Sequence, residues 1–145
     1  MSRMRVLFSA AEIAARVDAL ADDIASKVPT DFVIVGLLKG AAVFVADLAR
    51  ALDRTGAHPE IEFMRLASYG LASESSGVVQ LLGDVSAALA GRPVLLVDDI
   101  VDTGRSIAFA TTQLRQHGVG DVFVVGYGTD CAEKYRHLPY IGVVE

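Results

Sequence analysis

The sequence predicts an α/β fold built on a doubly wound, mostly parallel sheet. Continuous apolar runs at 31–38 and 93–98 are typical of strands that are covered on both faces. Each run is followed by a segment with apolar residues at helical spacing, at 41–52 and at 104–116. This alternation predicts parallel strands joined by helices, with ligands bound at the carboxyl ends of the strands. The 145 residues show neither a linker nor a repeat, so 1–145 is expected to form a single domain.

The N-terminal part of the chain is expected to form a further helix. Ser9 and Glu12 have the spacing of a capping box, so this helix should begin at Ser9 or Ala10. Its apolar face is predicted from residues spaced three and four apart, which are Ile13, Val17, Leu20 and Ile24.

Four more segments complete the predicted order. Residues 61–66 are a second candidate strand, and 81–89 read as a short edge strand and a turn. Residues 121–126 are β-like and are followed by a polar, aromatic tail. Between the strands, 68–77 is rich in Ser, Gly and Glu, and a polar stretch of this length inside a compact domain is usually functional or mobile.

The composition excludes several classes of protein. A net charge of −5 and a pI near 5.1 leave no basic stripe for nucleic acid. No apolar run reaches the roughly 18 residues of a membrane span, and the first residues do not have the pattern of a signal peptide. The single Cys131 cannot form an intramolecular disulfide, which fits a reducing cytosol, so a cytoplasmic location is expected. Zinc-ligand spacing is not found among His58, His117 and His137.

An acidic loop follows the apolar run at 93–98. It consists of Asp98, Asp99, Ile100, Val101, Asp102, Thr103, Gly104, Arg105 and Ser106. The amides at the start of the next helix, with the nearby hydroxyl side chains, are suited to bind a phosphate. The three carboxylates would repel that phosphate, so we expect them to face ribose hydroxyls or Mg²⁺. The alternative interpretation is an acidic loop that only caps the helix.

The segment 97–106 resembles the motif with which type I phosphoribosyltransferases bind phosphoribosyl pyrophosphate (PRPP). The resemblance implies that Asp98 and Asp99 hold the ribose hydroxyls and Mg²⁺. It also implies that Asp102 is the catalytic residue, which accepts or stabilises a proton at the imidazole nitrogen of a purine. The 5′-phosphate of PRPP would be enclosed by Thr103, Gly104, Arg105 and Ser106.

Two further segments are similar to the hypoxanthine-guanine branch of that family. The first, 36–40, resembles a pyrophosphate-binding loop with a cis peptide before its lysine. PRPP contacts would then come from Leu38, Lys39 and Gly40. In the second, Ser68 and Tyr69 open a loop that closes over the reacting centre and excludes water. From the residues alone, the lysine is equally an exposed residue at a helix start, and the polar loop is equally a solvated hairpin.

The stretch from Phe123 to Gly142 resembles the same branch. The resemblance implies that Phe123 stacks on the purine base and that the backbone of Val124 contacts the edge of the base. Asp130 would bind a second Mg²⁺, and Arg136 would contact pyrophosphate. Without the resemblance, 123–125 is a buried strand and the arginine is a surface charge.

The sequence departs from the family pattern after the helix that follows the PRPP motif. Residues 116–122 lead directly into Phe123, where the family has a core strand and the lysine that recognises the 6-oxo group of the purine. Either 121–126 replaces this core strand or it forms the base-binding hood, because the chain is too short for both. An internal deletion is a further interpretation.

The resemblance thus implies a cytoplasmic purine-salvage enzyme with a type I phosphoribosyltransferase fold and a small hood formed by the C-terminal segment. It would convert hypoxanthine, or also guanine, and PRPP into the nucleoside 5′-monophosphate and pyrophosphate, with Mg²⁺ as cofactor. The expected partners are PRPP, a 6-oxopurine base and further copies of the chain in a homodimer or homotetramer. The alternatives are a non-catalytic PRPP- or nucleotide-binding regulator or decayed copy, motivated by the missing lysine, and an enzyme of the same fold that acts on another base.

Overall fold

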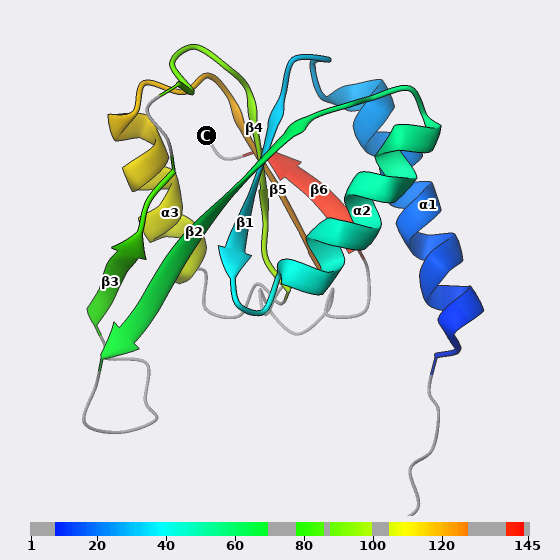
Figure 1. Cartoon of the computed structure of the whole chain (residues 1–145), viewed down its shortest axis with the longest axis horizontal. Helices are drawn as coiled ribbons and strands as arrows, with labels where there is room; N and C mark the ends of the chain where they lie inside the picture. Colours follow the sequence, from blue (N-terminus) through cyan, green and yellow to red (C-terminus); the bar gives the residue numbers. More distant parts are fainter. Residues whose placement is uncertain (1–7, 70–77, 86–87, 100–104, 128–138, 144–145) are drawn as a thin grey trace, which may run out of the picture.

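A computed structural model of the chain describes residues 8–69, 78–85, 88–99, 105–127 and 139–143. Helices and strands alternate along most of this part of the chain, as the apolar pattern predicts (Figure 1). The helices are α1 (Ala10–Lys27), α2 (Ala42–Arg54) and α3 (Arg105–Gln116). The strands are β1 (Val33–Leu38), β2 (Glu60–Tyr69), β3 (Val78–Gly83), β4 (Val94–Val97), β5 (Val122–Tyr127) and β6 (Pro139–Val143). Among the described helices, none is long and apolar enough to cross a membrane.

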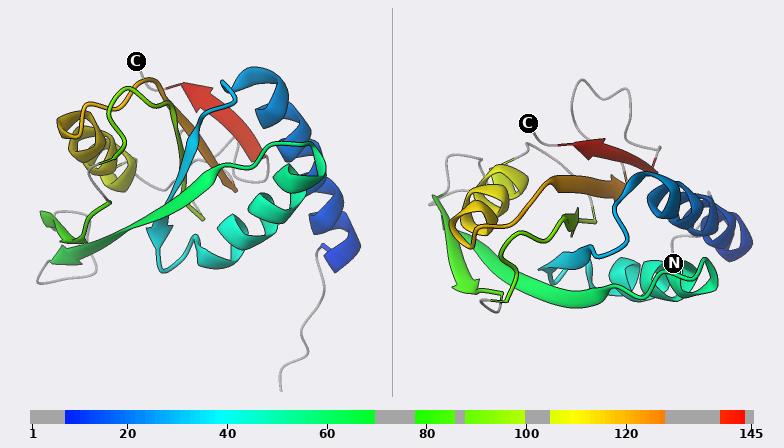
Figure 2. Two further views of the ribbon diagram at one scale, coloured as in Figure 1. Left: turned by 45° about the horizontal axis from the view of Figure 1, so that its top comes forward. Right: turned by 90° about the horizontal axis from the view of Figure 1, so that it is seen from above.

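The strands form one six-stranded sheet with the order β3-β2-β1-β4-β5-β6. The four inner strands are parallel, whereas β3 and β6 are antiparallel strands at the two edges. Helices α1 and α2 lie on one face of the sheet and α3 on the other (Figure 2). This arrangement confirms the predicted doubly wound, mostly parallel sheet.

The inner strands contribute to two cores because successive side chains of a strand point to opposite faces. Ile34, Leu95 and Val97 pack with α1 and α2, whereas Val35 and Leu96 pack with α3. All five of these side chains are fully or almost fully buried. Burial on both faces explains why these strands appear in the sequence as continuous apolar runs rather than alternating ones.

Helix α1 begins at the predicted capping box. The Ser9 hydroxyl accepts a hydrogen bond from the Glu12 amide at 3.1 Å, and the Ser9 amide donates to the Glu12 carboxylate at 3.2 Å. The buried face of the helix consists of Val17, Leu20, Ala21 and Ile24. Ile13, which was expected on this face, is 44% exposed, so the apolar face begins one turn later than predicted.

Replacing Ser9 by alanine is expected to lower the free energy of unfolding by about 1 kcal/mol, because an N-terminal amide of α1 would lose its acceptor. Urea denaturation followed by circular dichroism measures the change. Ser26→Ala is the matched control: this hydroxyl donates only to the Asp23 carbonyl in the exposed last turns of the same helix. That control should be neutral, since alanine has the highest helix propensity. Equal losses in both variants would contradict a specific role for the cap.

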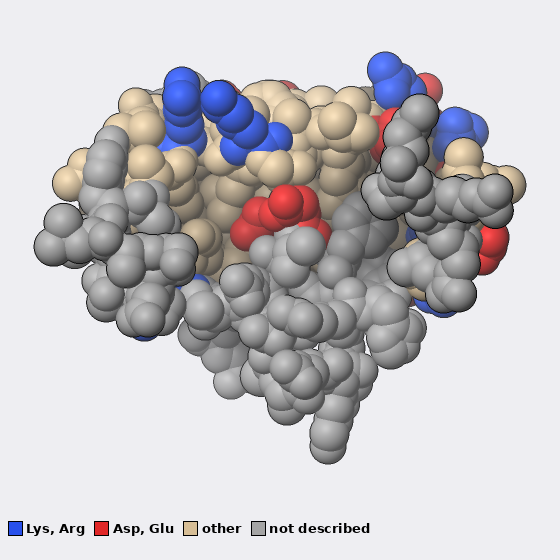
Figure 3. Space-filling model, turned by 90° about the horizontal axis from the view of Figure 1, so that it is seen from below, with Lys and Arg blue, Asp and Glu red and all other residues tan. Residues whose placement is uncertain are grey.

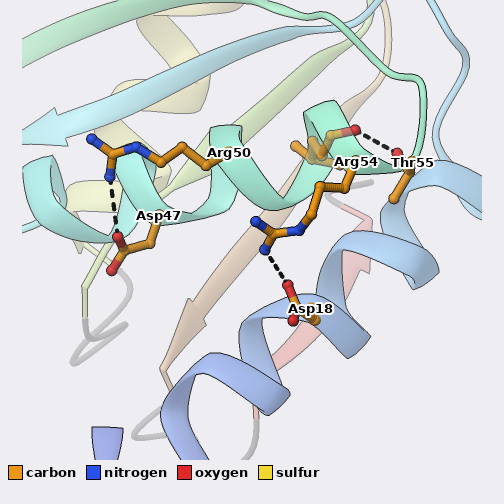
Figure 4. A network of polar contacts seen from close by, with 6 residues as sticks. Asp18, Asp47, Arg50, Arg54 and Thr55 are labelled. Atoms are coloured by element: carbon orange, nitrogen blue, oxygen red, sulfur yellow. Dashed lines mark hydrogen bonds and ion pairs between the residues drawn. The ribbon is translucent and has the colours of Figure 1, made fainter. Parts of the chain in front are cut away.

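A group of polar contacts lies on the outer side of α1 and α2 (Figure 4). Arg54 near the end of α2 forms an ion pair with Asp18 of α1, and Arg50 pairs with Asp47 one turn away on α2. The Thr55 hydroxyl donates to the Leu52 carbonyl at 2.6 Å where α2 ends. The ion pairs are largely exposed, so they contribute little to stability compared with the core beneath them.

The position of β5 decides between the two interpretations of 121–126, as a core strand or as a base-binding hood. It pairs in parallel with β4, and Phe123 lies opposite Leu95 while Val125 lies opposite Val97. Residues 122–126 are buried. This segment is therefore a core strand of the sheet and not part of a base-binding hood.

The described part of the C-terminal segment also differs from the prediction. Pro139–Val143 forms β6, which pairs antiparallel with β5 and extends the same sheet, where the sequence predicted a polar, aromatic tail. The sequence does not indicate a strand here because pairing with a distant strand leaves no local signal. Residues 128–138 lie outside the described part of the chain.

Candidate active site

The candidate site lies where β1 and β4 end side by side. From β1 the chain crosses to β2 through α2 on one face, and from β4 it crosses to β5 through α3 on the other face. The connections therefore diverge at this point, and in open α/β sheets such a switch point leaves a crevice at the carboxyl ends of the strands. Figure 3, which looks onto this side of the molecule, shows acidic side chains gathered in a hollow at its centre.

A pocket of about 260 Å³ occupies this crevice. It is lined by Leu37, Leu38, Gly40, Leu66, Asp98, Asp99 and Ser106. The lining thus comes from the two neighbouring strands β1 and β2, from the segments that follow β1 and β4, and from the first turn of α3. Apolar side chains form one part of the wall, and two adjacent carboxyl groups form another.

The two carboxyl groups are held by the backbone around them. The Asp98 amide donates to the Val125 carbonyl of β5 at 3.1 Å, and the Asp99 amide donates to the Asp98 carboxylate at 2.8 Å. Burial raises the pKa of Asp98 to about 7, and the side-chain hydrogen bond with Asp99 and the repulsion from its charge add to this rise. The hydrogen bond from the Asp99 backbone acts in the opposite direction. This pair therefore provides a favourable place for hydroxyl donors or a cation.

The turn between β1 and α2 contributes another part of the pocket wall. The peptide bond between Leu38 and Lys39 is cis, as the resemblance implied. The Ala41 amide donates to the Leu37 carbonyl and the Ala42 amide to the Lys39 carbonyl, both at 3.1 Å, so the turn leads directly into α2. Lys39 is exposed and Gly40 lines the pocket.

The structure brings together five of the predicted site residues in this pocket, namely Leu38, Gly40, Asp98, Asp99 and Ser106. Arg105 begins α3 beside them and is exposed. Ser68 and Tyr69 lie at the end of β2, with their backbones paired to β3. Five predicted site residues lie outside the described part of the chain: Asp102, Thr103, Gly104, Asp130 and Arg136.

Two pocket residues were not predicted as site residues: Leu66, and Leu37, which lies within the predicted loop 36–40. Both lie in the carboxyl-terminal halves of parallel strands, where ligands of such sheets bind. This position in the strands is a signal that the sequence contains. An aliphatic side chain, however, does not show by its chemistry whether it lines a pocket or packs in a core.

Phe123 and Val124, for which contacts with the base are predicted, both lie in β5. Phe123 is only 9% exposed and packs in the core beneath α1 and α2, level with Leu95 of β4. Asp98 lies three residues farther along that strand, or roughly 10 Å at about 3.3 Å per residue. Val124 is buried against the core on the α3 side. Their contacts with a base stay a prediction.

The described residues fit Mg²⁺, the cofactor expected from the sequence. Mg²⁺ is bound through oxygen ligands, commonly one or two carboxylates together with water and substrate phosphates. Asp98 and Asp99 supply two such carboxylates at the pocket wall. Within the described ranges no cluster of three or more His, Cys, Asp or Glu residues could hold an ion without a substrate.

Comparison with known proteins identifies relatives with this architecture. The family model of the phosphoribosyl transferase domain matches residues 7–133. The chain is 34% identical to a hypoxanthine-guanine phosphoribosyltransferase of Bacillus subtilis over 170 aligned residues, covering 97% of the chain and 93% of the relative. A hypoxanthine-guanine phosphoribosyltransferase of Dictyostelium discoideum is also 34% identical, covering 98% and 95%.

Solved structures show the same similarity. A hypoxanthine-guanine phosphoribosyltransferase of Bacillus anthracis superposes with a TM-score of 0.75 at 28% identity, covering 99% of this chain and 100% of that one. A hypoxanthine phosphoribosyltransferase of Trypanosoma cruzi in complex with the product IMP superposes with a TM-score of 0.70 at 28% identity, covering 99% of this chain and 98% of that one. The alignment with the Bacillus subtilis relative is 170 positions long, so at least 25 of them have no counterpart among the 145 residues here. This agrees with the shortening inferred from the sequence.

Proposed function

Because the chain belongs to the phosphoribosyltransferase family, in its hypoxanthine-guanine branch, we propose that it transfers the phosphoribosyl group of PRPP to a 6-oxopurine. The products would be the nucleoside 5′-monophosphate and pyrophosphate, and the preferred base would be hypoxanthine, or hypoxanthine and guanine. The observation that supports this proposal most strongly is the pocket at the switch point of the sheet. There the Asp98 and Asp99 carboxyl groups face the turn that contains Gly40.

Each side of this pocket has a proposed role. The carboxylates of Asp98 and Asp99 would accept hydrogen bonds from the ribose hydroxyls of PRPP, and they would hold Mg²⁺ together with Asp130. When bound, Mg²⁺ supplies positive charge that neutralises the departing pyrophosphate. Lys39 and Arg136 would add to this neutralisation on the side of the β1–α2 turn.

The remaining proposed roles belong to the loops around the pocket. The start of α3 would bind the 5′-phosphate through its amides, because the positive end of the helix dipole favours an anion there. The residues concerned are Thr103, Gly104, Arg105 and Ser106. Leu38 and Gly40 would contact pyrophosphate through their backbones, and a loop opened by Ser68 and Tyr69 would cover the reacting centre.

Asp102 is the proposed catalytic residue, placed near the imidazole nitrogen of the base to manage its proton. Asp102→Asn is expected to lower turnover much more than PRPP affinity, because the amide keeps the size of the side chain but cannot accept the proton. Steady-state rates with hypoxanthine and calorimetric titration with PRPP compare the two quantities. Equal losses in both would contradict the assigned role.

A second candidate function is binding of PRPP or a nucleotide without transfer. Two observations favour it: Phe123 is buried in the core, and at least 25 positions of a related enzyme have no counterpart in the 145 residues of this chain. A chain with this pocket but without a base site would behave as a regulator or a decayed copy.

Calorimetry and an activity assay separate these candidates. The chain is titrated with Mg²⁺ and PRPP, then with inosine and guanosine monophosphates, and turnover is followed with hypoxanthine, guanine and adenine. Transfer to a 6-oxopurine supports the enzyme. PRPP binding without turnover of any base supports the binding protein, and transfer to another base alone would indicate a different specificity. The absence of PRPP binding would overturn both candidates.

We also propose that the chain forms a homodimer or homotetramer in the cytoplasm. Apolar side chains that remain exposed on α2 and β2 support the oligomer, since Val43 is 75% exposed and Ile61 43%. Sedimentation equilibrium with and without PRPP tests the association, and a monomer under both conditions would contradict it.

A further inference from the structure

Gly40 lies directly against the carboxyl group of Asp99. A Cβ atom built on Gly40 would stand 2.4 Å from Asp99 Oδ2, 2.7 Å from its Cγ and 3.0 Å from Oδ1. Real Cβ atoms essentially never approach another heavy atom closer than 3.0 Å. The carboxylate therefore occupies the space that any side chain at position 40 would need.

The backbone of Gly40 gives no other reason for a glycine at this position. Positive φ angles, which favour glycine, are found in the described residues at Gly56, Gly91 and Gly118, with φ between 74° and 90°. Gly40 is not among them, and the next residue, Ala41, has a right-handed φ of −79°. A side chain at position 40 would therefore require the Asp99 carboxylate to shift.

This contact joins two parts of the pocket that are far apart in the sequence. Gly40 belongs to the turn between β1 and α2, while Asp99 follows β4. The Asp99 amide donates to the Asp98 carboxylate, and the Asp98 amide is fixed to the Val125 carbonyl of β5. The Asp99 side chain also forms a hydrogen bond with the Asp98 side chain, so a displacement of the Asp99 carboxylate would disturb Asp98.

We propose that Gly40 is a positioning residue, whose missing side chain lets the Asp99 carboxylate lie against the β1–α2 turn and fixes the distance between the two halves of the PRPP site. This inference rests on the proposed function, because the pocket must bind PRPP for that distance to matter. Its basis in the structure is the steric contact between Gly40 and Asp99, which exists with or without a ligand.

A double-mutant cycle tests this coupling. Gly40→Ala would push the Asp99 carboxylate away by at least about 0.6 Å. A misplacement of about 1 Å can cost about 100-fold in catalysis, and for this smaller displacement we expect a loss of PRPP affinity of about 10-fold. In an Asp99→Ala background the added methyl group meets no carboxylate, so the same change should alter PRPP affinity by less than about 2-fold. Dissociation constants for PRPP with Mg²⁺ are measured for the four proteins, with titrations extended into the millimolar range.

Gly83→Ala is the matched control for the glycine substitution. Its Cβ would stand 3.6 Å from the Arg65 Cβ, an ordinary contact, and its φ is not positive. PRPP affinity of this variant should equal that of the unchanged chain. Asp99→Asn provides a second comparison, because its side chain has the size of aspartate and should not relieve the effect of Gly40→Ala.

Thermal unfolding without ligand is a second, independent test of the contact between Gly40 and Asp99. Gly40→Ala should lower the Tm by about 3–10 °C in the unchanged chain, because it overpacks the turn. In the Asp99→Ala background it should leave the Tm unchanged or raise it by about 1–3 °C, since alanine restricts the unfolded chain. This reversal of sign is not expected from a general disturbance of the turn.

The outcomes separate the proposal from the function on which it rests. If Gly40→Ala lowers PRPP affinity equally in both backgrounds, while the unchanged chain binds PRPP, the positioning role alone would be overturned. No PRPP binding by the unchanged chain would overturn the proposed function, and the Tm cycle would then still decide whether Gly40 positions Asp99. If Gly40→Ala lowers PRPP affinity in the unchanged chain but not in the Asp99→Ala background, both the positioning role and the proposed function are supported.

Discussion

Replacing Phe123 by alanine is expected to lower the free energy of unfolding by about 3–5 kcal/mol, which is the usual effect of removing a buried aromatic side chain. Phe123 is 9% exposed and belongs to the core cluster beneath α1 and α2, beside Leu95 and Val125. Its removal would leave a cavity that close-packed neighbours fill only in part. Urea or guanidinium denaturation, followed by circular dichroism, measures the change. Phe63→Ala, at a phenylalanine of β2 that is 36% exposed, is the control and should lose much less.

The conservative variant Phe123→Leu distinguishes a core residue from a base-stacking one. As a core residue, leucine at this position should cost less than about 1.5–2 kcal/mol of stability and leave the affinity for a purine monophosphate unchanged. If Phe123 instead stacked on the base, loss of the aromatic ring would weaken nucleotide binding by about 5- to 30-fold, equivalent to about 1–2 kcal/mol. Strong loss of nucleotide affinity with little loss of stability would therefore contradict the placement of β5.

The parts of the fold that could be predicted from the sequence are those with a local signature. The capping box of Ser9 and Glu12 identifies the start of α1, and the apolar runs identify β1 and β4. The site could be located in advance for a related reason. Asp98 and Asp99 follow a strand that the sequence shows to be buried, and parallel strands present their carboxyl ends at one edge. Both residues line the pocket found there.

The role of 121–126 could not be predicted, because its apolar pattern is the same in a core strand and in a hood. What decides between them is the pairing of Phe123 with Leu95, and pairing between distant segments depends on packing rather than on the residues of one strand. The edge strand β6 was missed for the same reason. The contact between Gly40 and Asp99 was also invisible in the sequence, since it depends on how closely the ends of β1 and β4 approach.

Replacing Asp98 by asparagine is expected to stabilise the ligand-free protein at pH 8 by about 2 kcal/mol. At this pH the Asp98 carboxyl is ionised, although burial and the neighbouring Asp99 raise its pKa from 3.8 to about 7. Each unit of pKa difference between the folded and unfolded states corresponds to about 1.4 kcal/mol. We expect less than the full shift would give, because the carboxyl is partly exposed and solvent screens its charge. Asparagine removes the charge and keeps an oxygen that can accept the hydrogen bond from the Asp99 amide.

The pH dependence of this difference has a definite sign. Because the folded protein holds the Asp98 proton more tightly than the unfolded chain, the favourable contribution of Asp98 is complete below pH 3.8 and is lost as the pH rises to about 7. The advantage of Asp98→Asn should therefore be largest at pH 8 and shrink steadily toward pH 4. Denaturation of both proteins across this range, with a chelator present, measures it, and titrating groups that do not interact with Asp98 cancel in the comparison. A difference that is constant with pH would contradict the raised pKa.

The same variant should bind PRPP and Mg²⁺ more weakly at pH 8. The half-buried Asp98 carboxylate destabilises the free protein, and it is the group that a cation and ribose hydroxyls would satisfy.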